Sequence, residues 1–175
     1  MHKIKNYSLF IMFLVAAFTL CFSVASAKAQ NDKQVNGIDH RSTVSAVVKN
    51  LLNVANNEKG GIGDEIRAVA QAQNDAQNAV ASEIDKINNR SKVKTFLIGT
   101  DYKNIGQLRS EMVKTGNQID QLNRLLSRTT STQTIVSLQG QIKILEQEQQ
   151  KINDFLKANE SKFSLFGWFV KLFNK

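Results

Sequence analysis

Apolar residues recur at alternating steps of three and four over the second half of the chain. The series runs through residues 101–127, is interrupted by the polar stretch "SRTTSTQ", and resumes through residues 133–162. Such spacing puts one apolar stripe along each of two helices. Folding the chain back near residue 130 brings the stripes together, so the pattern predicts an antiparallel coiled-coil hairpin or an elongated helical bundle. The predicted seam comprises Ile105, Leu108, Met112, Ile119, Leu122, Leu126, Ile135, Leu138, Ile142, Leu145, Ile152 and Leu156.

The predicted hairpin has a definite register. Counting outward from the turn pairs Ile119 with Ile142, and Met112 with Gln149. A polar residue at a seam position can fix the register of a coiled coil, and a position close to the surface would explain Gln149 equally well.

The first half of the chain predicts two more helices. The first covers residues 42–57, is capped by Asp39 or Ser42, and ends at the glycines of "NNEKGGIG", which predict a hinge or tight corner. The second covers residues 63–98, carries a thin apolar stripe, and closes at Gly99. Its last stretch, "VKTFLIG", has the local composition of a strand, but the chain offers no partner strand. The expected fold class is therefore all-α.

The closing stretch, residues 163–175, is the most aromatic part of the chain. As a helix it divides into an apolar arc and a polar arc that carries lysines, with Trp168 at the border, which is typical of a helix lying in a membrane interface. The 11 residues from Phe163 to Phe173 would extend about 17 Å against a hydrocarbon core of about 30 Å, so they cannot cross a bilayer. The predicted membrane or partner contacts are Phe163, Leu165, Phe166, Trp168, Phe169, Val170, Leu172 and Phe173, with Lys171 and Lys175 at lipid headgroups.

The first 27 residues have the organisation of a secretion signal. Lys3 and Lys5 precede an apolar run, and "ASA" ending at Ala27 offers the small residues that a signal peptidase reads. We therefore expect cleavage after Ala27, a flexible leader over residues 28–41, and export to the periplasm or the cell surface. An uncleaved anchor is the alternative, since roughly 18 apolar residues can span a bilayer.

The remaining chemistry is sparse. The only cysteine, Cys21, lies inside the signal, and His40 is the only histidine outside it. The exported chain therefore lacks the residues for disulfides, thiolate metal sites and histidine-based triads. Its acidic residues are scattered beside Lys and Arg, which is typical of solvated helix faces. The sequence predicts no catalytic residue, no metal site, no cofactor and no enzymatic activity.

The charge of the chain narrows the choice of partners. The formal net charge is +8, and removal of the signal takes away two lysines and no acid, which leaves +6. The lysines are dispersed and no aromatic-basic groove motif is present, so the charge does not point to nucleic acid.

Two classes of function follow from these patterns. The first is a non-enzymatic, exported helical scaffold or interaction protein, held at a membrane surface by its closing stretch. The second is a soluble extracytoplasmic protein, chaperone-like or partner-binding, whose closing stretch packs against "VKTFLIG" or against a second copy in a homo-oligomer.

Three stretches, "HRSTV", "KTFLIGTDYKNIGQLRSE" and "KFSLFGWFVKLF", resemble small exported proteins of candidate-phylum bacteria, over most of the exported chain. The resemblance implies bacterial export and a helical fold. No activity and no catalytic or binding residues come with it.

Overall fold

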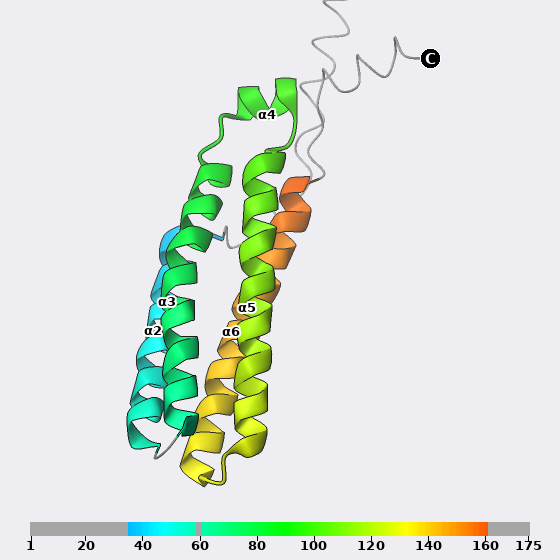
Figure 1. Cartoon of the computed structure of the whole chain (residues 1–175). Coiled ribbons are helices and arrows are strands. Elements are labelled where there is room, and N and C mark those ends of the chain that lie inside the picture. The colour runs from blue at the N-terminus through cyan, green and yellow to red at the C-terminus, as the bar shows by residue number, and fades with distance from the viewer. Residues whose placement is uncertain (1–34, 59–60, 161–175) are drawn as a thin grey trace, which may run out of the picture. The chain divides into compact units, whose positions relative to one another are not determined.

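Five helices make up the part of the chain that the computed structural model describes, which is residues 35–58 and 61–160. All of them belong to one compact unit that begins at Val35. These residues contain no strand, so the predicted all-α class is confirmed. In chain order the helices are α2 (Gly37–Asn57), α3 (Gly61–Asn88), α4 (Lys92–Ile98), α5 (Tyr102–Arg128) and α6 (Thr132–Glu160) (Figure 1).

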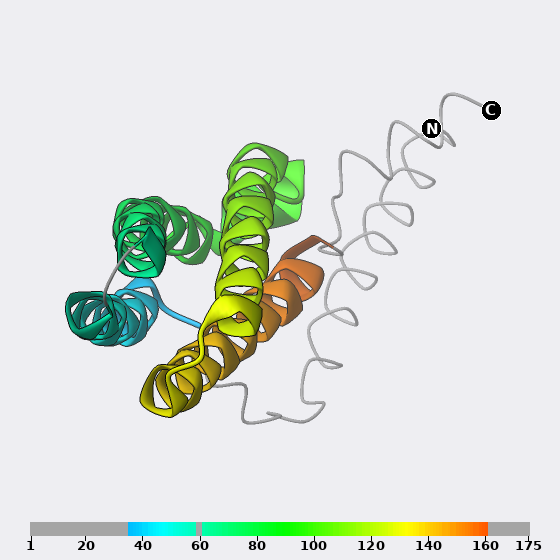
Figure 2. The same cartoon turned by 60° about the horizontal axis from the view of Figure 1, so that its bottom comes forward.

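The four long helices form an antiparallel bundle (Figures 1 and 2). Helix α2 packs against α3 and α6, and α5 packs against the same two helices. Helices adjacent in the chain are therefore also adjacent in the bundle. The predicted α5–α6 hairpin is one half of this arrangement, and α2–α3 is the other half. The short helix α4 lies in the connection between α3 and α5 (Figure 1).

Helix α2 begins five residues earlier than the sequence predicted, because Asn36 caps it. The Asn36 Oδ1 accepts the Asp39 backbone N–H at 2.7 Å, and the Asn36 Nδ2 donates to Asp39 Oδ2 at 2.9 Å. Reciprocal bonds of this kind satisfy donors that a helix start leaves open. The Gly37 N–H also donates to Asp85 Oδ1 on α3. The prediction of a flexible leader is therefore wrong for residues 37–41.

The prediction of one continuous helix over residues 63–98 is also wrong, because α3 ends at Asn88 and α4 is a separate helix. The Asn88 side chain donates to the carbonyl oxygen of Val35 at 2.8 Å. Arg90 donates to the carbonyl oxygen of Gly99 at 3.0 Å. These bonds join the break to other parts of the chain and separate α4 from α3. Gly99 has a φ of 94°, a conformation that favours glycine, so it ends α4 as predicted.

The core consists of two apolar clusters along the bundle. The first lies toward the end of the bundle where α2 and α5 end, and all four long helices contribute to it. The second lies toward α4 and draws on α3, α5 and α6. Fully buried members include Leu51, Ile66 and Leu122 in the first cluster, and Ile84 and Leu108 in the second. Burial of these side chains supplies the main driving force for folding.

Ten of the twelve predicted seam residues are buried, and Leu126 and Ile135 are half-buried. Beside the turn, Leu125 and Thr134 are buried in their place. The reason is that α5 also packs against α3, and α6 also packs against α2, so each core-facing stripe is wider than a two-helix seam. The buried seam residues are Ile105, Leu108, Met112, Ile119, Leu122, Leu138, Ile142, Leu145, Ile152 and Leu156.

The predicted pairing of Met112 with Gln149 is confirmed. The Gln149 Nε2 donates to the carbonyl oxygen of Met112 at 3.3 Å. A Cβ at Gly116 would lie 3.1 Å from the same nitrogen, so the small residue leaves room for the glutamine. Gln149 is half-buried, and its hydrogen bond joins α5 to α6.

We expect two glycine substitutions to have opposite effects on stability. A Cβ at Gly63 would lie 2.7 Å from the carbonyl oxygen of Ala55, so Gly63→Ala should lower the free energy of unfolding by about 1–3 kcal/mol. A Cβ at Gly140 meets nothing within 4 Å, so Gly140→Ala in α6 should raise it by about 0.5–1 kcal/mol. Urea unfolding followed by circular dichroism measures both. Equal stabilisation by both variants would contradict the close contact of α3 with the end of α2.

Candidate functional site

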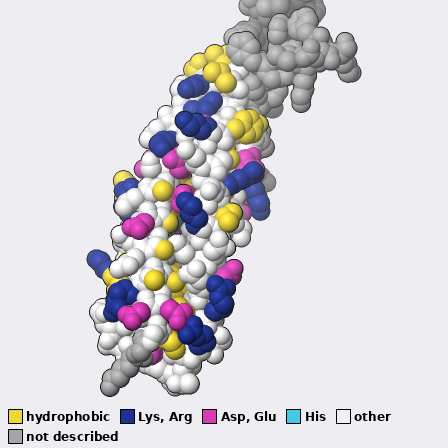
Figure 3. Space-filling model, in the orientation of Figure 1, with side chains coloured by type: hydrophobic (Ala, Val, Ile, Leu, Met, Phe, Trp, Pro, Cys, Tyr) yellow, Lys and Arg dark blue, Asp and Glu magenta, His cyan; other side chains and the backbone are white. Residues whose placement is uncertain are grey.

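Exposed apolar side chains gather at the end of the bundle that carries α4. Of the eight large apolar side chains that are exposed among the described residues, five lie between residues 93 and 102. Figure 3 shows this cluster at the top of the molecule, with Lys and Arg side chains beside it. We define the α4 surface as Val93, Phe96, Leu97, Ile98 and Tyr102 together with Lys92, Lys94 and Lys103.

None of the residues of α4 is buried, so apolar packing does not hold this helix in place. Polar contacts made by the residues on either side of it do so instead. The guanidinium of Arg90 forms an ion pair with Asp101, with 3.0 Å between Nη1 and Oδ2, and also donates to the Gly99 carbonyl oxygen. The Thr100 hydroxyl lies 3.3 Å from the carbonyl oxygen of Asn159 and 3.1 Å from that of Glu160. The segment after α4 is thereby joined to both the end of α3 and the end of α6.

The ion pair beneath α4 is shielded from solvent on both sides. The side chain of Arg90 is 13% exposed and that of Asp101 is 17% exposed. Burial alone would raise the pKa of Asp101, but hydrogen bonds from Arg90 and Asn104, with the positive charge of Arg90, outweigh it and lower the pKa. Asp101 therefore stays ionised near neutral pH, which keeps the pair intact.

The α4 surface is positively charged. The nearby carboxylates are engaged, since Asp101 pairs with Arg90 and Glu160 pairs with Arg109. No acidic side chain in the described part of the chain pairs with the three lysines of the surface, Lys92, Lys94 and Lys103. Exposed apolar groups and unneutralised lysines therefore occur together at this end.

The contacts predicted from the closing stretch, Phe163 to Phe173 with Lys171 and Lys175, lie outside the described residues. The structure does describe the end of α6, from which the closing stretch follows in sequence. Helix α6 ends at Glu160, whose carbonyl oxygen contacts the Thr100 hydroxyl. The last described residue before the closing stretch is therefore at the same end as the α4 surface. The exposure of "VKTFLIG" was not predicted from the sequence. Its signal was the run of consecutive apolar residues from Phe96 to Ile98, which does not fit the three-and-four spacing of a buried stripe.

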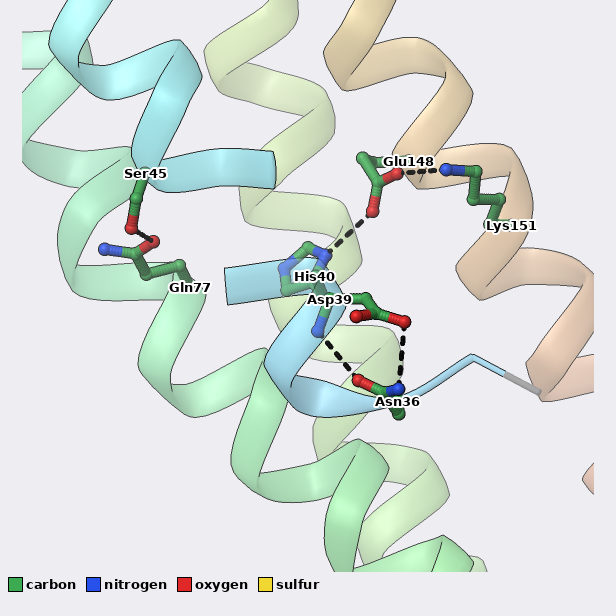
Figure 4. A network of polar contacts seen from close by, with 7 residues as sticks. All are labelled: Asn36, Asp39, His40, Ser45, Gln77, Glu148 and Lys151. Atoms are coloured by element: carbon green, nitrogen blue, oxygen red, sulfur yellow. Dashed lines mark hydrogen bonds and ion pairs between the residues drawn. The ribbon is translucent and has the colours of Figure 1, made fainter. Parts of the chain in front are cut away.

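A second polar cluster lies inside the bundle, between α2 and α6 (Figure 4). The His40 Nδ1 is 3.3 Å from Glu148 Oε2, and the Lys151 Nζ donates to Glu148 Oε1. The side chains of His40 and Glu148 are 6% and 7% exposed. An ionised carboxylate only accepts hydrogen bonds, so Nδ1 of His40 carries the proton and donates. On the other side of α2, the Ser45 hydroxyl donates to Gln77 Oε1 at 2.9 Å.

The charge on Glu148 is stabilised by its partners. Burial raises the pKa of this carboxyl, but hydrogen bonds from His40 and Lys151, with the charge of Lys151, outweigh burial and hold the pKa below its usual range. From its residue type, Glu148 was expected to lie on a solvated helix face. The missed signal was its position three residues after Leu145 and four before Ile152, on the apolar stripe of α6.

The other features of the described residues offer little for chemistry. They contain no group of three His, Cys, Asp or Glu side chains that could hold a metal ion. A shallow groove of about 450 Å³ runs between α5 and α6, and its floor is formed by Met112, Gly116 and Leu156. The exposed side chain of Val113 stands at its edge.

No family model matches the chain, and no curated protein or solved structure matches it. Within residues 35–58 and 61–160, no helix has the length and apolarity to cross a bilayer. The function of the protein is therefore inferred from its own residues.

The buried carboxylate makes stability depend on pH in the acid range. Because the folded pKa of Glu148 is lowered, its stabilising effect is complete above the unfolded pKa and is lost as pH falls below about 4. We expect Glu148→Gln to lower the free energy of unfolding at pH 7 by about 1–3 kcal/mol and to flatten its decline between about pH 5 and 3. Glu146→Gln, an exposed position on α6, is the control. Identical pH profiles for both variants would argue against the buried pair.

The bonds of Arg90 to Asp101 and Gly99 act as a clamp beneath α4, so their removal should affect this helix locally. Arg90→Ala removes the bonds to Asp101 and Gly99, so amide hydrogens of residues 92–98 should exchange at least about tenfold faster, which corresponds to about 1.4 kcal/mol. Hydrogen exchange with peptide-level mass spectrometry measures this. Arg67→Ala, which removes an exposed pair with Asp64, should leave α4 unchanged. Unchanged exchange in Arg90→Ala would mean that α4 is held by other contacts.

Proposed function

We propose that this chain is a non-enzymatic, exported helical scaffold, held at a membrane surface by residues 163–175. One observation carries the proposal. Helix α6 ends at Glu160, beside the α4 surface, so the aromatic closing stretch begins at the end of the bundle where exposed apolar residues and lysines gather. The sides of the bundle carry charged and amide side chains, which suits a body that stays in water.

The closing stretch has the properties that such an anchor needs. In this proposal it continues as an amphipathic helix and lies in the interface, with the α5–α6 hairpin acting as a coiled coil that leads to it. Five or six large side chains would each contribute about 1.5–3 kcal/mol if fully buried, so partial insertion still gives useful binding. Lys171 and Lys175 on the polar arc would meet anionic headgroups. The secretion signal over residues 1–27 would deliver the chain to the outer face of the cytoplasmic membrane.

The interior of the bundle favours a structural role over catalysis. The buried His40–Glu148 pair is closed in by helices and completed by Lys151, so its hydrogen-bonding groups serve the fold. The proposed role for the body is therefore that of a spacer or a partner-binding element.

A soluble partner-binding protein is the second candidate, and the groove between α5 and α6 is the observation that favours it. Its apolar floor of Met112 and Leu156, with Val113 exposed at the edge, is a surface on which an extended or helical client segment could lie. In that case the closing stretch would pack on the protein itself or on a second copy.

Liposome flotation separates the two candidates. We expect the chain from Lys28 to Lys175 to float with vesicles. A version that ends at Lys162 should remain in solution, and its circular dichroism should show that the helices of the bundle are still formed. The described bundle ends at Glu160, so the shorter version keeps all of it. If neither version floats, and truncation instead lowers the melting temperature or breaks an oligomer, membrane anchoring is wrong and the soluble candidate is favoured.

A further inference from the structure

The α4 surface is not explained by the anchoring role of residues 163–175, which concerns a different part of the chain. A connection between two helices of a bundle needs only polar residues, and the α5–α6 connection is of that kind, with Thr129, Thr130 and Ser131. The α3–α5 connection instead forms a helix whose apolar side chains reach solvent. Val93 is 66% exposed, Phe96 51% and Ile98 62%.

We propose that α4 is a second membrane-contacting element, which inserts its apolar side chains into the interface of an anionic bilayer beside the closing stretch. This inference rests on the proposed function and deepens it. The bundle would then meet the lipid surface at two points, α4 and residues 163–175, both at the end where α6 stops.

The composition of the α4 surface fits a lipid interface. Phe96 and Ile98 supply apolar groups, and Tyr102, 71% exposed, supplies an amphipathic ring of the kind enriched at headgroup level. Lys92, Lys94 and Lys103 supply positive charges that long flexible stems can place at the headgroups. Helix α4 has 7 residues and so extends only about 10 Å, which suits contact with the interface rather than deep insertion.

Charge complementarity favours lipid over the closing stretch as the group that covers α4. Residues 161–175 carry three lysines and no acidic residue, and the α4 surface also carries three lysines. Packing one on the other would bring like charges together, whereas an anionic membrane attracts both.

The size of the surface favours lipid over a second copy of the chain. A standard protein interface uses roughly 20–30 residues on each side. The α4 surface comprises eight residues, of which five are apolar or aromatic. A patch this small suits a contact that works together with another anchor on the same chain.

The clamp beneath α4 gives the contact a fixed position. The Arg90–Asp101 ion pair and the Thr100 hydroxyl bonds join the ends of the helix to α3, α5 and α6. Apolar side chains on a helix fixed in this way remain exposed without collapsing onto the core. With lipid at both α4 and the closing stretch, the bundle would be oriented with its α4 end toward the membrane.

Two spectroscopic reporters can test the two contacts separately. Trp168 is the only tryptophan and lies in the closing stretch, so its emission reports that segment alone. The chain from Lys28 has no cysteine, so Ile98→Cys labelled with a polarity-sensitive fluorophore reports α4. Val113→Cys, on the side of the bundle, is the matched control, because Val113 is 66% exposed and Ile98 62%. The probes are vesicles of phosphatidylcholine with and without phosphatidylglycerol.

We expect the label at position 98 to shift to the blue on vesicles that contain phosphatidylglycerol, while the label at position 113 stays unchanged. Phe96→Ser with Ile98→Ser should lower the partition coefficient at least about tenfold, and the control pair Val113→Ser with Val136→Ser should not. Neutralising Lys92, Lys94 and Lys103 with glutamine should lower binding to anionic vesicles about fivefold per lysine at low salt.

Three results would overturn the inference. If Trp168 responds to vesicles and the label at position 98 does not, α4 makes no lipid contact, but the proposed anchoring function stands. If neither reporter responds, both proposals fail. If the label at position 98 is already blue-shifted without vesicles, the protein itself covers α4. Loss of that shift on truncation at Lys162 would then identify the closing stretch as the cover, and dependence on protein concentration would identify a second copy.

Discussion

A carboxylate can be buried between helices only when hydrogen-bond donors meet it, and Glu148 satisfies this condition through His40 and Lys151. His40 comes from the first turn of α2 and Glu148 from the middle of α6, so their contact exists in one register of the two helices only. A shift by one turn would leave the buried carboxylate without its partner, which is strongly destabilising. The apolar clusters supply most of the stability, and the buried pair selects the arrangement.

The polar contacts between the two clusters extend this selection to the other helices. Gln149 reaches from α6 to the backbone of α5, and Ser45 reaches from α2 to Gln77 on α3. These bonds join three adjacent pairs of helices when the His40–Glu148 contact is included. Apolar stripes of similar spacing can slide past one another, so the polar contacts explain how a chain rich in Gln and Asn adopts a single packing.

Regular three-and-four spacing made α5 and α6 predictable, including the pairing of Met112 with Gln149. The bundle as a whole was not predictable in the same way, because the contacts that join α2 to α6 come from His40 and Glu148, which by type belong to a solvated surface. The start of α2 depends on Asn36 binding Asp39, a local capping pattern that is present in the sequence but was not used in the prediction. The break before α4 depends on Arg90 bonding to Gly99 and Asp101 on the far side of that helix, and local composition does not reveal such partners. The sequence shows that the run from Phe96 to Ile98 is apolar, but it does not show that the run is exposed, because exposure depends on which helices cover these residues.

The antiparallel order of the four long helices has an electrostatic consequence at the α4 end. Two helices, α2 and α5, begin there, and two, α3 and α6, end there. Positive and negative ends of the helix dipoles therefore lie side by side and largely cancel. What remains of the field at that end comes from side chains, and the three lysines of the α4 surface have no carboxylate paired with them among the described residues. The electrostatic potential that an approaching anionic surface meets would thus come from a few flexible lysine side chains instead of from the helix dipoles. Salt can screen these exposed charges.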